Sequence, residues 1–185
     1  GRQLWFPRLP NARELTLRQL LSHRSGIPET QENDAFMAAI TTNLDKNWLS
    51  SQLMASVLDQ KAQSKPGTKY LYTDMNYIIA GAVYERAMNR PLFMEIDQKL
   101  LQPLGHTNTV PAANRDLTGV VPGRLEPRAG PYAKFGLADS SMRNGRFAYN
   151  LQAEHAGGGI ISTSHDLARW ASLLWTGKVF SEARL

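Results

Sequence analysis

The apolar residues of this chain recur mostly at the three- and four-residue spacing of an α-helix. The clearest case covers residues 74–88, where the spacing predicts a helix with one buried face. Its candidate core positions are Tyr77, Ile78, Gly81 and Tyr84. A glycine inside a helix costs about 1 kcal/mol relative to alanine, so Gly81 indicates that another element packs closely there.

Helix-end patterns predict further helices on both sides of this one. Thr16 and Gln19 form the Thr-x-x-Gln pattern of a capping box, and Gly26 can adopt the left-handed conformation that ends a helix. Pro91 suits the first position of a later helix. The remaining predicted helices cover residues 35–40, 48–61, 91–101 and a segment that Ser162 or Ser164 caps and Gly177 ends.

Strand patterns are few, and residues 119–121 and 160–161 are the best candidates. Residues 107–150 hold four prolines and few apolar runs, which predicts a long irregular segment that could wall a site. The glycines at 157–159 predict a tight passage of the backbone. The predicted fold class is mainly α, with a long irregular segment and a few short strands.

Composition is that of an ordinary globular protein. The 185 residues suffice for one domain or two small lobes, and 42% are hydrophobic and 20% charged. The net charge of +5 comes from scattered Arg and Lys, without the basic block that would predict nucleic-acid binding. The absence of cysteine excludes disulfides and thiolate metal sites, and no apolar run predicts a transmembrane helix.

The candidate catalytic residues are Tyr72 and Asp74, which lie where a loop meets the predicted helix at 74–88. Helix starts carry unpaired N–H groups and a partial positive charge, which can hold anionic chemistry. A phenol, with an ordinary pKa near 10, accepts a proton from a serine only where a cation lowers that pKa. Alternatively, Tyr72 is a half-buried structural tyrosine and Asp74 a helix cap. No Ser-x-x-Lys occurs in the sequence, so the nucleophile that such a tyrosine serves is expected on another segment.

Other catalytic and ligating patterns are missing from the sequence. The four histidines show no metal-ligand spacing, so neither a metal nor another cofactor is predicted. Residues 155–157 superficially resemble a His-x-Gly strand, but the glycines that follow favour a turn. The glycine run lacks the Lys-Ser/Thr of a phosphate-binding loop, and no Gly-x-Ser-x-Gly occurs. We expect three residues of the last helix in the core or at a lobe interface: Trp170, Leu174 and Trp175.

Four segments, in order, resemble one family of serine hydrolases. Residues 15–28 (LTLRQLLSHRSGIP) resemble the LT-x-x-x-LL-S/T-H-x-SG-[LI]-P stretch of enzymes related to class C β-lactamases, which include penicillin-binding DD-peptidases and family VIII esterases. Residues 70–77 (YLYTDMNY) resemble their F/Y-x-Y-S-N-x-x-Y segment. Residues 102–109 (QPLGHTNT) resemble x-PLGM-x-x-T, and residues 156–170 (AGGGIISTSHDLARW) resemble AGG-x-x-ST-x-x-DLA-R. The resemblance spans nearly the whole chain.

This resemblance implies a fold in which an α/β domain and a helical domain enclose the active site in a groove. In the family, a Ser-x-x-Lys serine attacks an acyl carbonyl, and the lysine shares proton transfer with the tyrosine of Tyr-x-Asn. Tyr72 would take that tyrosine's role. The serine and lysine would precede Gly1, and a Lys-Thr-Gly or His-x-Gly strand would follow Leu185. Residues 1–185 are therefore expected to form a partial domain, mostly the helical lobe of the serine β-lactamase and DD-peptidase fold.

The function expected from the resemblance is part of a serine hydrolase that forms an acyl-enzyme on an ester, a peptide amide or a β-lactam. Its expected partners are a small-molecule or peptidoglycan-like substrate and the missing segments of the same protein, and the implied location is periplasmic or extracytoplasmic. The chain alone is expected to be inactive. Asp74 replaces the family's asparagine; a carboxylate opposes phenolate formation but could hold a lysine ammonium. Two alternatives stay open: a non-catalytic binding module with the same lobe, and an unrelated helical interaction domain.

Overall fold

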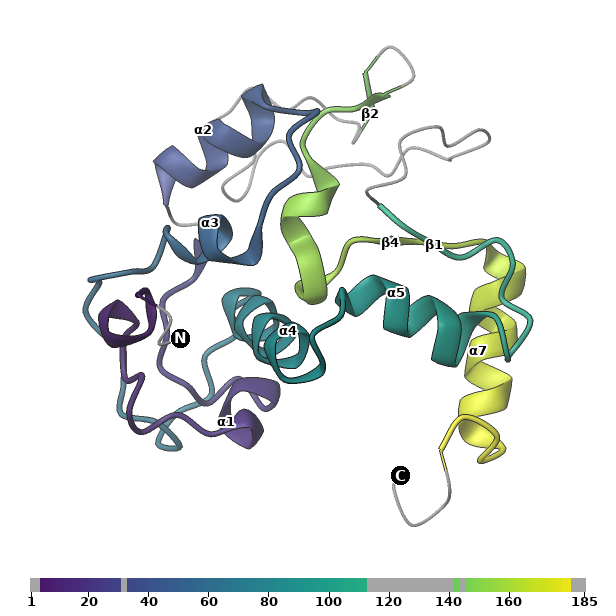
Figure 1. Cartoon of the computed structure of the whole chain (residues 1–185), viewed down its shortest axis with the longest axis horizontal. Helices are drawn as coiled ribbons and strands as arrows, with labels where there is room; N and C mark the ends of the chain where they lie inside the picture. Colours follow the sequence, from purple (N-terminus) through teal and green to yellow (C-terminus); the bar gives the residue numbers. More distant parts are fainter. Residues whose placement is uncertain (1–3, 31–32, 113–141, 144–145, 181–185) are drawn as a thin grey trace.

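The computed structural model describes residues 4–30, 33–112, 142–143 and 146–180 (Figure 1). The helical elements are η1 (Phe6–Arg8), α1 (Leu17–Leu21), α2 (Asp34–Thr42), α3 (Ser50–Met54), α4 (Met75–Met88), α5 (Leu92–Ile96), η3 (Asp97–Leu101), η4 (Leu151–Gly157) and α7 (Ser164–Trp175). Two antiparallel pairs of short strands join β1 (Val110–Pro111) to β4 (Ile160–Ile161) and β2 (Met142–Arg143) to β3 (Arg146–Phe147). The mainly helical class and the strand at 160–161 are confirmed, whereas residues 119–121 lie outside the described residues.

Helix α4 lies at the centre of the structure and packs against η4, α3 and α1 (Figure 1). Its first half buries Met75, Ile78 and Ile79. Gly81 is buried as well, under η4. The approach is so close that a Cβ at Gly81 would lie only 2.8 Å from the Cβ of Ala156. The close packing that this glycine predicted is therefore confirmed. We call η1, α1 to α4 and η4 the α4 bundle.

The apolar core belongs to the α4 bundle. Every buried member of the core cluster lies between residues 9 and 79, except Ala153 of η4. Burying one aliphatic side chain of this kind contributes about 1.5–3 kcal/mol to the free energy of unfolding. The apolar residues with the least exposure are Ile27, Met37, Leu53, Met54, Val57, Met75 and Ile78.

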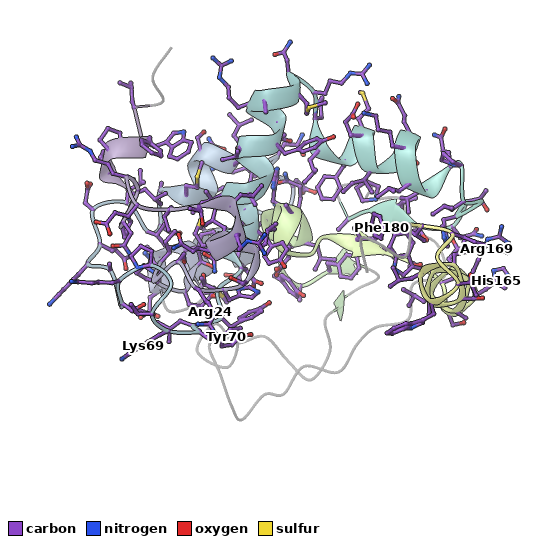
Figure 2. The ribbon with its side chains drawn as sticks, turned by 90° about the horizontal axis from the view of Figure 1, so that it is seen from below. Arg24, Lys69, Tyr70, His165, Arg169 and Phe180 are labelled. Carbon is purple, nitrogen blue, oxygen red and sulfur yellow. The ribbon has the colours of Figure 1, made fainter. Side chains whose placement is uncertain are left out.

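Among the remaining described elements, α5, η3, β1, β4 and α7 form a second region that we call the α7 limb. It extends to the opposite side of the molecule, where Figure 2 shows His165 and Arg169 of α7 far from Arg24 and Tyr70 of the bundle. Asp166 is the buried residue of α7 within the part of the chain that the structure describes.

Trp175, one of the α7 residues expected in the core or at a lobe interface, lies outside the core of the described residues. Its side chain is 82% exposed, although the helix has an apolar stripe. Trp170 instead packs edge-on against the ring of His106, with ring centroids 5.8 Å apart.

The predicted helix ends are partly confirmed. Thr16 and Gln19 form the capping box, with the Gln19 N–H donating to the Thr16 hydroxyl and the Thr16 N–H donating to the Gln19 side chain. Helix α1, however, ends at Leu21, and the left-handed residue that follows it is His23 (φ 53°) rather than Gly26. Gly26 is also left-handed, and a Cβ there would collide with the carbonyl of Ser64.

Two other predicted helices differ from the structure. The helix expected at 48–61 is reduced to α3. Asp59, further along the chain, turns left-handed (φ 61°) and pairs with Arg8 of η1. The last helix is capped by Thr163, whose hydroxyl accepts the N–H of Asp166 at 3.1 Å, and not by either serine beside it.

Candidate active site

The start of α4 is fixed by Thr73. Its buried hydroxyl accepts the N–H of Met75 at 3.2 Å and donates to the carbonyl of Pro28 at 3.2 Å. Asp74 occupies the N-cap position, but its side chain makes no capping hydrogen bond. The alternative that Asp74 serves as the helix cap is therefore wrong for its side chain, which contacts Tyr72 instead.

Tyr72 and Asp74, the predicted pair, are in direct contact. The Tyr72 hydroxyl donates to Asp74 Oδ1 at 2.6 Å. The tyrosine is 58% exposed, whereas the aspartate is only 8% exposed. The phenol is thus accessible at the surface of the α4 bundle while its partner carboxylate is anchored inside.

Two further carboxylates lie close to Asp74. Glu29 accepts the backbone N–H of Asp74 at 3.0 Å. Glu154 of η4 lines a cavity of about 10 Å³ together with Asp74 and Thr30. A cavity of this size has room for about one water molecule. The rest of its wall is apolar and is formed by Phe36, Met37, Ile40, Ile78 and Ala153.

These carboxylates raise the pKa of the phenol. The hydrogen bond to Asp74 is the largest cause, followed by burial and by the negative charges of Asp74, Glu29 and Glu154, which together hold the pKa of Tyr72 far above its ordinary 10. Burial, with the charges of Asp74 and Glu29, raises the pKa of Glu154 to about 7. The site therefore favours the neutral phenol, and an added cation beside the carboxylates would oppose that preference.

The glycine run brings η4 against the start of α4. A Cβ at Gly157 would lie 3.2 Å from the Cβ of Asp74 and 3.3 Å from its carbonyl oxygen, so only glycine fits without displacement. The predicted tight passage is confirmed. The turn predicted at residues 155–157 is also confirmed, because η4 is a 3-10 segment kinked at His155 (φ 44°).

Three tyrosine rings surround His23, the residue that follows α1. The ring centroid of His23 lies 4.5 Å from that of Tyr72, 5.3 Å from that of Tyr77 and 5.8 Å from that of Tyr70. The Tyr77 hydroxyl donates to the carbonyl of Leu21 at 3.1 Å, which ties α4 to the end of α1.

The other histidines make separate contacts. His155 is buried, and burial lowers its pKa although Glu85 lies 3.6 Å from its Nε2. His165 is exposed on α7 (Figure 2). Within the described residues, no three His, Asp or Glu side chains come together in a group that could hold a metal ion.

Sequence reasoning brought out Tyr72 and Asp74 but missed Glu29 and Glu154 as their neighbours. Glu29 follows directly on the segment of residues 15–28 that resembles the family, and Glu154 precedes the glycine run. Neither glutamate stands in a catalytic pattern, so no local pattern would have identified them. Their position depends on how the loop after α1 and η4 pack onto α4.

The family is decided by a match that covers nearly all of the chain. The family model described as Beta-lactamase matches residues 5–185. The chain belongs to the beta-lactamase family. The alternative of an unrelated helical interaction domain is therefore wrong, and the chain has its place in a family of serine hydrolases.

Similar proteins agree with this membership. A putative D-alanyl-D-alanine carboxypeptidase of Escherichia coli (strain K12) is 28% identical over 97 residues, which are 52% of this chain and 21% of that protein. The D-stereospecific amidohydrolase of a Streptomyces species has a TM-score of 0.76 at 24% identity, covering 93% of this chain and 50% of that structure. The D-amino acid amidase of Ochrobactrum anthropi SV3, solved with D-phenylalanine, has a TM-score of 0.74 at 22% identity, covering 97% of this chain and 50% of that structure. Both structures share the fold of this chain.

This member of the family spans only part of its relatives. It covers about half the length of the two amide-hydrolase structures and about one fifth of the carboxypeptidase. None of the described helices is long and apolar enough to cross a membrane.

Proposed function

We propose that this chain is the helical part of a serine hydrolase that forms an acyl-enzyme, with Tyr72 as the proton-transfer residue. The observation that carries the proposal is the exposed Tyr72 hydroxyl, held at 2.6 Å on the buried carboxylate of Asp74 where α4 begins. A Ser-x-x-Lys from another segment of the same protein would supply the nucleophile. Residues 1–185 would then be a partial domain, mostly the helical lobe.

In the proposed reaction, the serine hydroxyl loses its proton to the Tyr72 phenolate as its oxygen attacks the acyl carbonyl. The C–N or C–O bond to the leaving group then breaks, and the proton passes from Tyr72 to the leaving amine or alcohol. Water hydrolyses the acyl-serine in a second half-reaction in which Tyr72 first accepts and then returns a proton. Atoms and charges balance in each half without a metal or another cofactor.

Because residue 74 is an aspartate and not an asparagine, the proposed reaction requires a cation beside Tyr72. The carboxylates around Tyr72 raise its pKa, so the phenolate forms only when a cation neutralises them. A lysine ammonium placed between Tyr72 and Asp74 would do so, since it would pair with the carboxylate and lower the pKa of the phenol. The Ser-x-x-Lys lysine fits this role by charge and by chemistry.

For the substrate, we propose the amide bond of a peptide or amino acid derivative ahead of an ester or a β-lactam. The relatives named above are a D-alanyl-D-alanine carboxypeptidase, an amidohydrolase and an amino acid amidase, all of which are named for the hydrolysis of amide bonds. An extracytoplasmic location would suit a peptidoglycan-like substrate.

The proposal is tested by Tyr72→Phe in a protein that joins this chain to its Ser-x-x-Lys segment. We expect turnover of a peptide amide or nitrophenyl ester to fall about a hundredfold or more, as on loss of a general base. The matched control is Tyr70→Phe, because Tyr70 is a similarly exposed tyrosine two residues away. Equal turnover in the two variants would remove Tyr72 from the mechanism. The 185-residue chain alone should show no burst of acylation.

A second candidate is a binding module that keeps the lobe without the chemistry. The raised pKa of Tyr72 and the carboxylate at position 74 favour it, because both oppose proton transfer. Asp74→Asn separates the two functions, since it removes a negative charge 2.6 Å from the phenol oxygen. For the hydrolase we expect a changed pH dependence of turnover, with the acidic limb, on which Tyr72 loses its proton, moved toward lower pH. For the binding module we expect substrate affinity without turnover in either form.

A further inference from the structure

His23 occupies a backbone position where glycine is the usual residue. It follows the C-cap residue Ser22, and its N–H donates to the carbonyl of Leu20 at 3.0 Å while the next N–H, of Arg24, donates to Gln19 at 2.8 Å. These two bonds form a Schellman motif, whose left-handed residue is most often glycine. His23 adopts φ 53° there, a conformation that costs free energy for a residue with a Cβ. A strained residue at this position points to a role for its side chain.

The imidazole of His23 contacts the segment that carries the proposed catalytic pair. Its Nδ1 accepts the backbone N–H of Thr73 at 3.4 Å and lies 3.2 Å from the Nδ2 of Asn76. Because a peptide N–H and an amide NH₂ are both donors, Nδ1 is the acceptor and the ring proton is assigned to Nε2. The residue whose N–H is held, Thr73, stands directly between Tyr72 and Asp74.

The same ring also supports the phenol itself. The rings of His23 and Tyr72 have centroids 4.5 Å apart and an interplanar angle of 32°. The carbonyl of His23 accepts the N–H of Leu71 at 2.8 Å, so the backbone before Tyr72 is fixed as well. An exposed tyrosine would otherwise exchange between rotamers, and the distance between its hydroxyl and Asp74 would vary with them.

We propose that His23 is a positioning residue for Tyr72, with its ring packed against the phenol and its Nδ1 holding the peptide that joins Tyr72 to Asp74. This inference rests on the proposed function for its catalytic meaning. In that reaction, His23 keeps the phenol oxygen at one place relative to the attacking serine and takes no proton itself. Its contribution is to orientation, which a small displacement of a reacting group can largely remove.

The first test needs no activity and uses the 185-residue chain. The chain is labelled on its tyrosine rings, and the signals of Tyr72 are assigned by their loss in Tyr72→Phe. In His23→Gly, we expect the Tyr72 ring signals to move toward those of an exposed tyrosine, because the neighbouring ring is gone. The matched control is Asn89→Gly, which changes the left-handed residue (φ 52°) at the end of α4 in the same way. The control should leave the Tyr72 signals in place.

If His23→Gly does not fold, the same measurement can be made on a second variant. His23→Asn tolerates the left-handed backbone and places an oxygen where Nδ1 was, so the hydrogen bond to Thr73 can persist without the ring. We expect the amide signal of Thr73 to stay and the Tyr72 ring signals to move. Tyr72 signals that stay unchanged in both His23 variants would overturn the proposal, because His23 would then be only a helix end.

The last test separates this inference from the proposed function. In the protein that carries the Ser-x-x-Lys segment, we expect His23→Gly to lower kcat on the order of tenfold to a hundredfold with KM little changed. If Tyr72→Phe lowers kcat and His23→Gly does not, the positioning role is wrong and the hydrolase stands. If Tyr72→Phe has no effect on kcat, the proposed role of Tyr72 in proton transfer fails, while the ring signals still decide whether His23 holds Tyr72.

Discussion

The α4 bundle and the α7 limb are stabilised by different interactions. The bundle contains the apolar core cluster, to which residues 9–79 contribute all members but one. The limb buries charged and polar side chains, among them Glu95 (2% exposed) and Asp166 (2% exposed). The comparison teaches that similar helical patterns in one sequence can be stabilised by apolar burial in one region and by hydrogen-bonded charges in another.

The buried carboxylate of Glu95 in the limb has a polar partner for each of its oxygens. Glu95 accepts from the Tyr84 hydroxyl and pairs with Arg90 and Lys99, and these contacts, that with Lys99 first, lower its pKa to about 2. A buried carboxylate is tolerated only when its oxygens are paired in this way. Buried, paired charges fix the orientation of the elements that carry them. A misplaced partner costs such a side chain more free energy than it costs an apolar contact.

The largest effect that would sharpen the comparison is expected from Leu53→Ala in α3. Leu53 is fully buried against α4, so the variant should lose about 2–5 kcal/mol of unfolding free energy through lost burial and the cavity left behind. Its matched control is Leu167→Ala in α7, where the leucine is exposed and the change should stay within about 0.5 kcal/mol. Urea denaturation measures both. Similar losses for the two leucines would break the comparison.

A smaller effect on stability is expected from Glu154, a carboxyl group that the α4 bundle largely buries. Burial and two carboxylates raise the pKa of Glu154 from 4.5 to about 7, so the folded state holds this proton to higher pH than the unfolded state does. Stability from Glu154 is therefore present below about pH 4.5 and lost as pH rises to about 7. At about 1.4 kcal/mol for each pH unit of that interval, the loss reaches about 3 kcal/mol.

Glu154→Gln should remove this loss. We expect the variant to be more stable than the parent at pH 8 and equal to it at pH 4, as measured by urea denaturation across that range. The remaining pH dependence of the variant's unfolding free energy should come from His155. Because burial lowers the pKa of His155, stability should fall as pH drops below about 6.5, the opposite of the trend from Glu154. Glu14→Gln, at an exposed glutamate, is the control. Parallel pH curves for parent and Glu154→Gln would contradict the expectation.

The smallest and most local effect is expected from Asp166→Asn in the limb. Asp166 accepts the hydroxyl of Thr109 at 2.8 Å and the N–H of Asn108 at 3.0 Å. The amide of the variant can keep only part of this network, so hydrogen exchange at Asn108 and in the first turn of α7 should quicken on the order of tenfold. Amides of the α4 bundle should be unchanged.

Acid should reproduce this local effect in the parent chain. The hydrogen bond from Thr109, followed by that from Asn108, lowers the pKa of Asp166. Its contribution to stability is therefore present above the ordinary pKa of a carboxyl near 4 and lost as pH falls through the lower value of the folded state. Exchange that quickens equally in the bundle would show that the two regions unfold together.

Much of the fold could be predicted from local patterns, because helix spacing and capping depend on residues within one turn of each other. The capping box at Thr16, the helix at 74–88 and the strand at 160–161 are confirmed on that basis. The length of α3 and the left-handed residue after α1 could not be predicted. Asp59 pairs with Arg8, and Gly26 lies against Ser64, and both contacts join residues distant in the sequence.

The sequence alone determined that a tyrosine and a carboxylate stand two residues apart at the start of a helix, since both are set by chain order and by the α4 pattern. Only the tertiary structure decided what surrounds them. His23 and Glu29 from the loop after α1, and Glu154 from η4, surround Tyr72 and Asp74. Hydrogen bonds, ring packing and charge act through space, over distances that no sequence spacing encodes. The electrostatic character of the phenol is therefore a property of the folded chain.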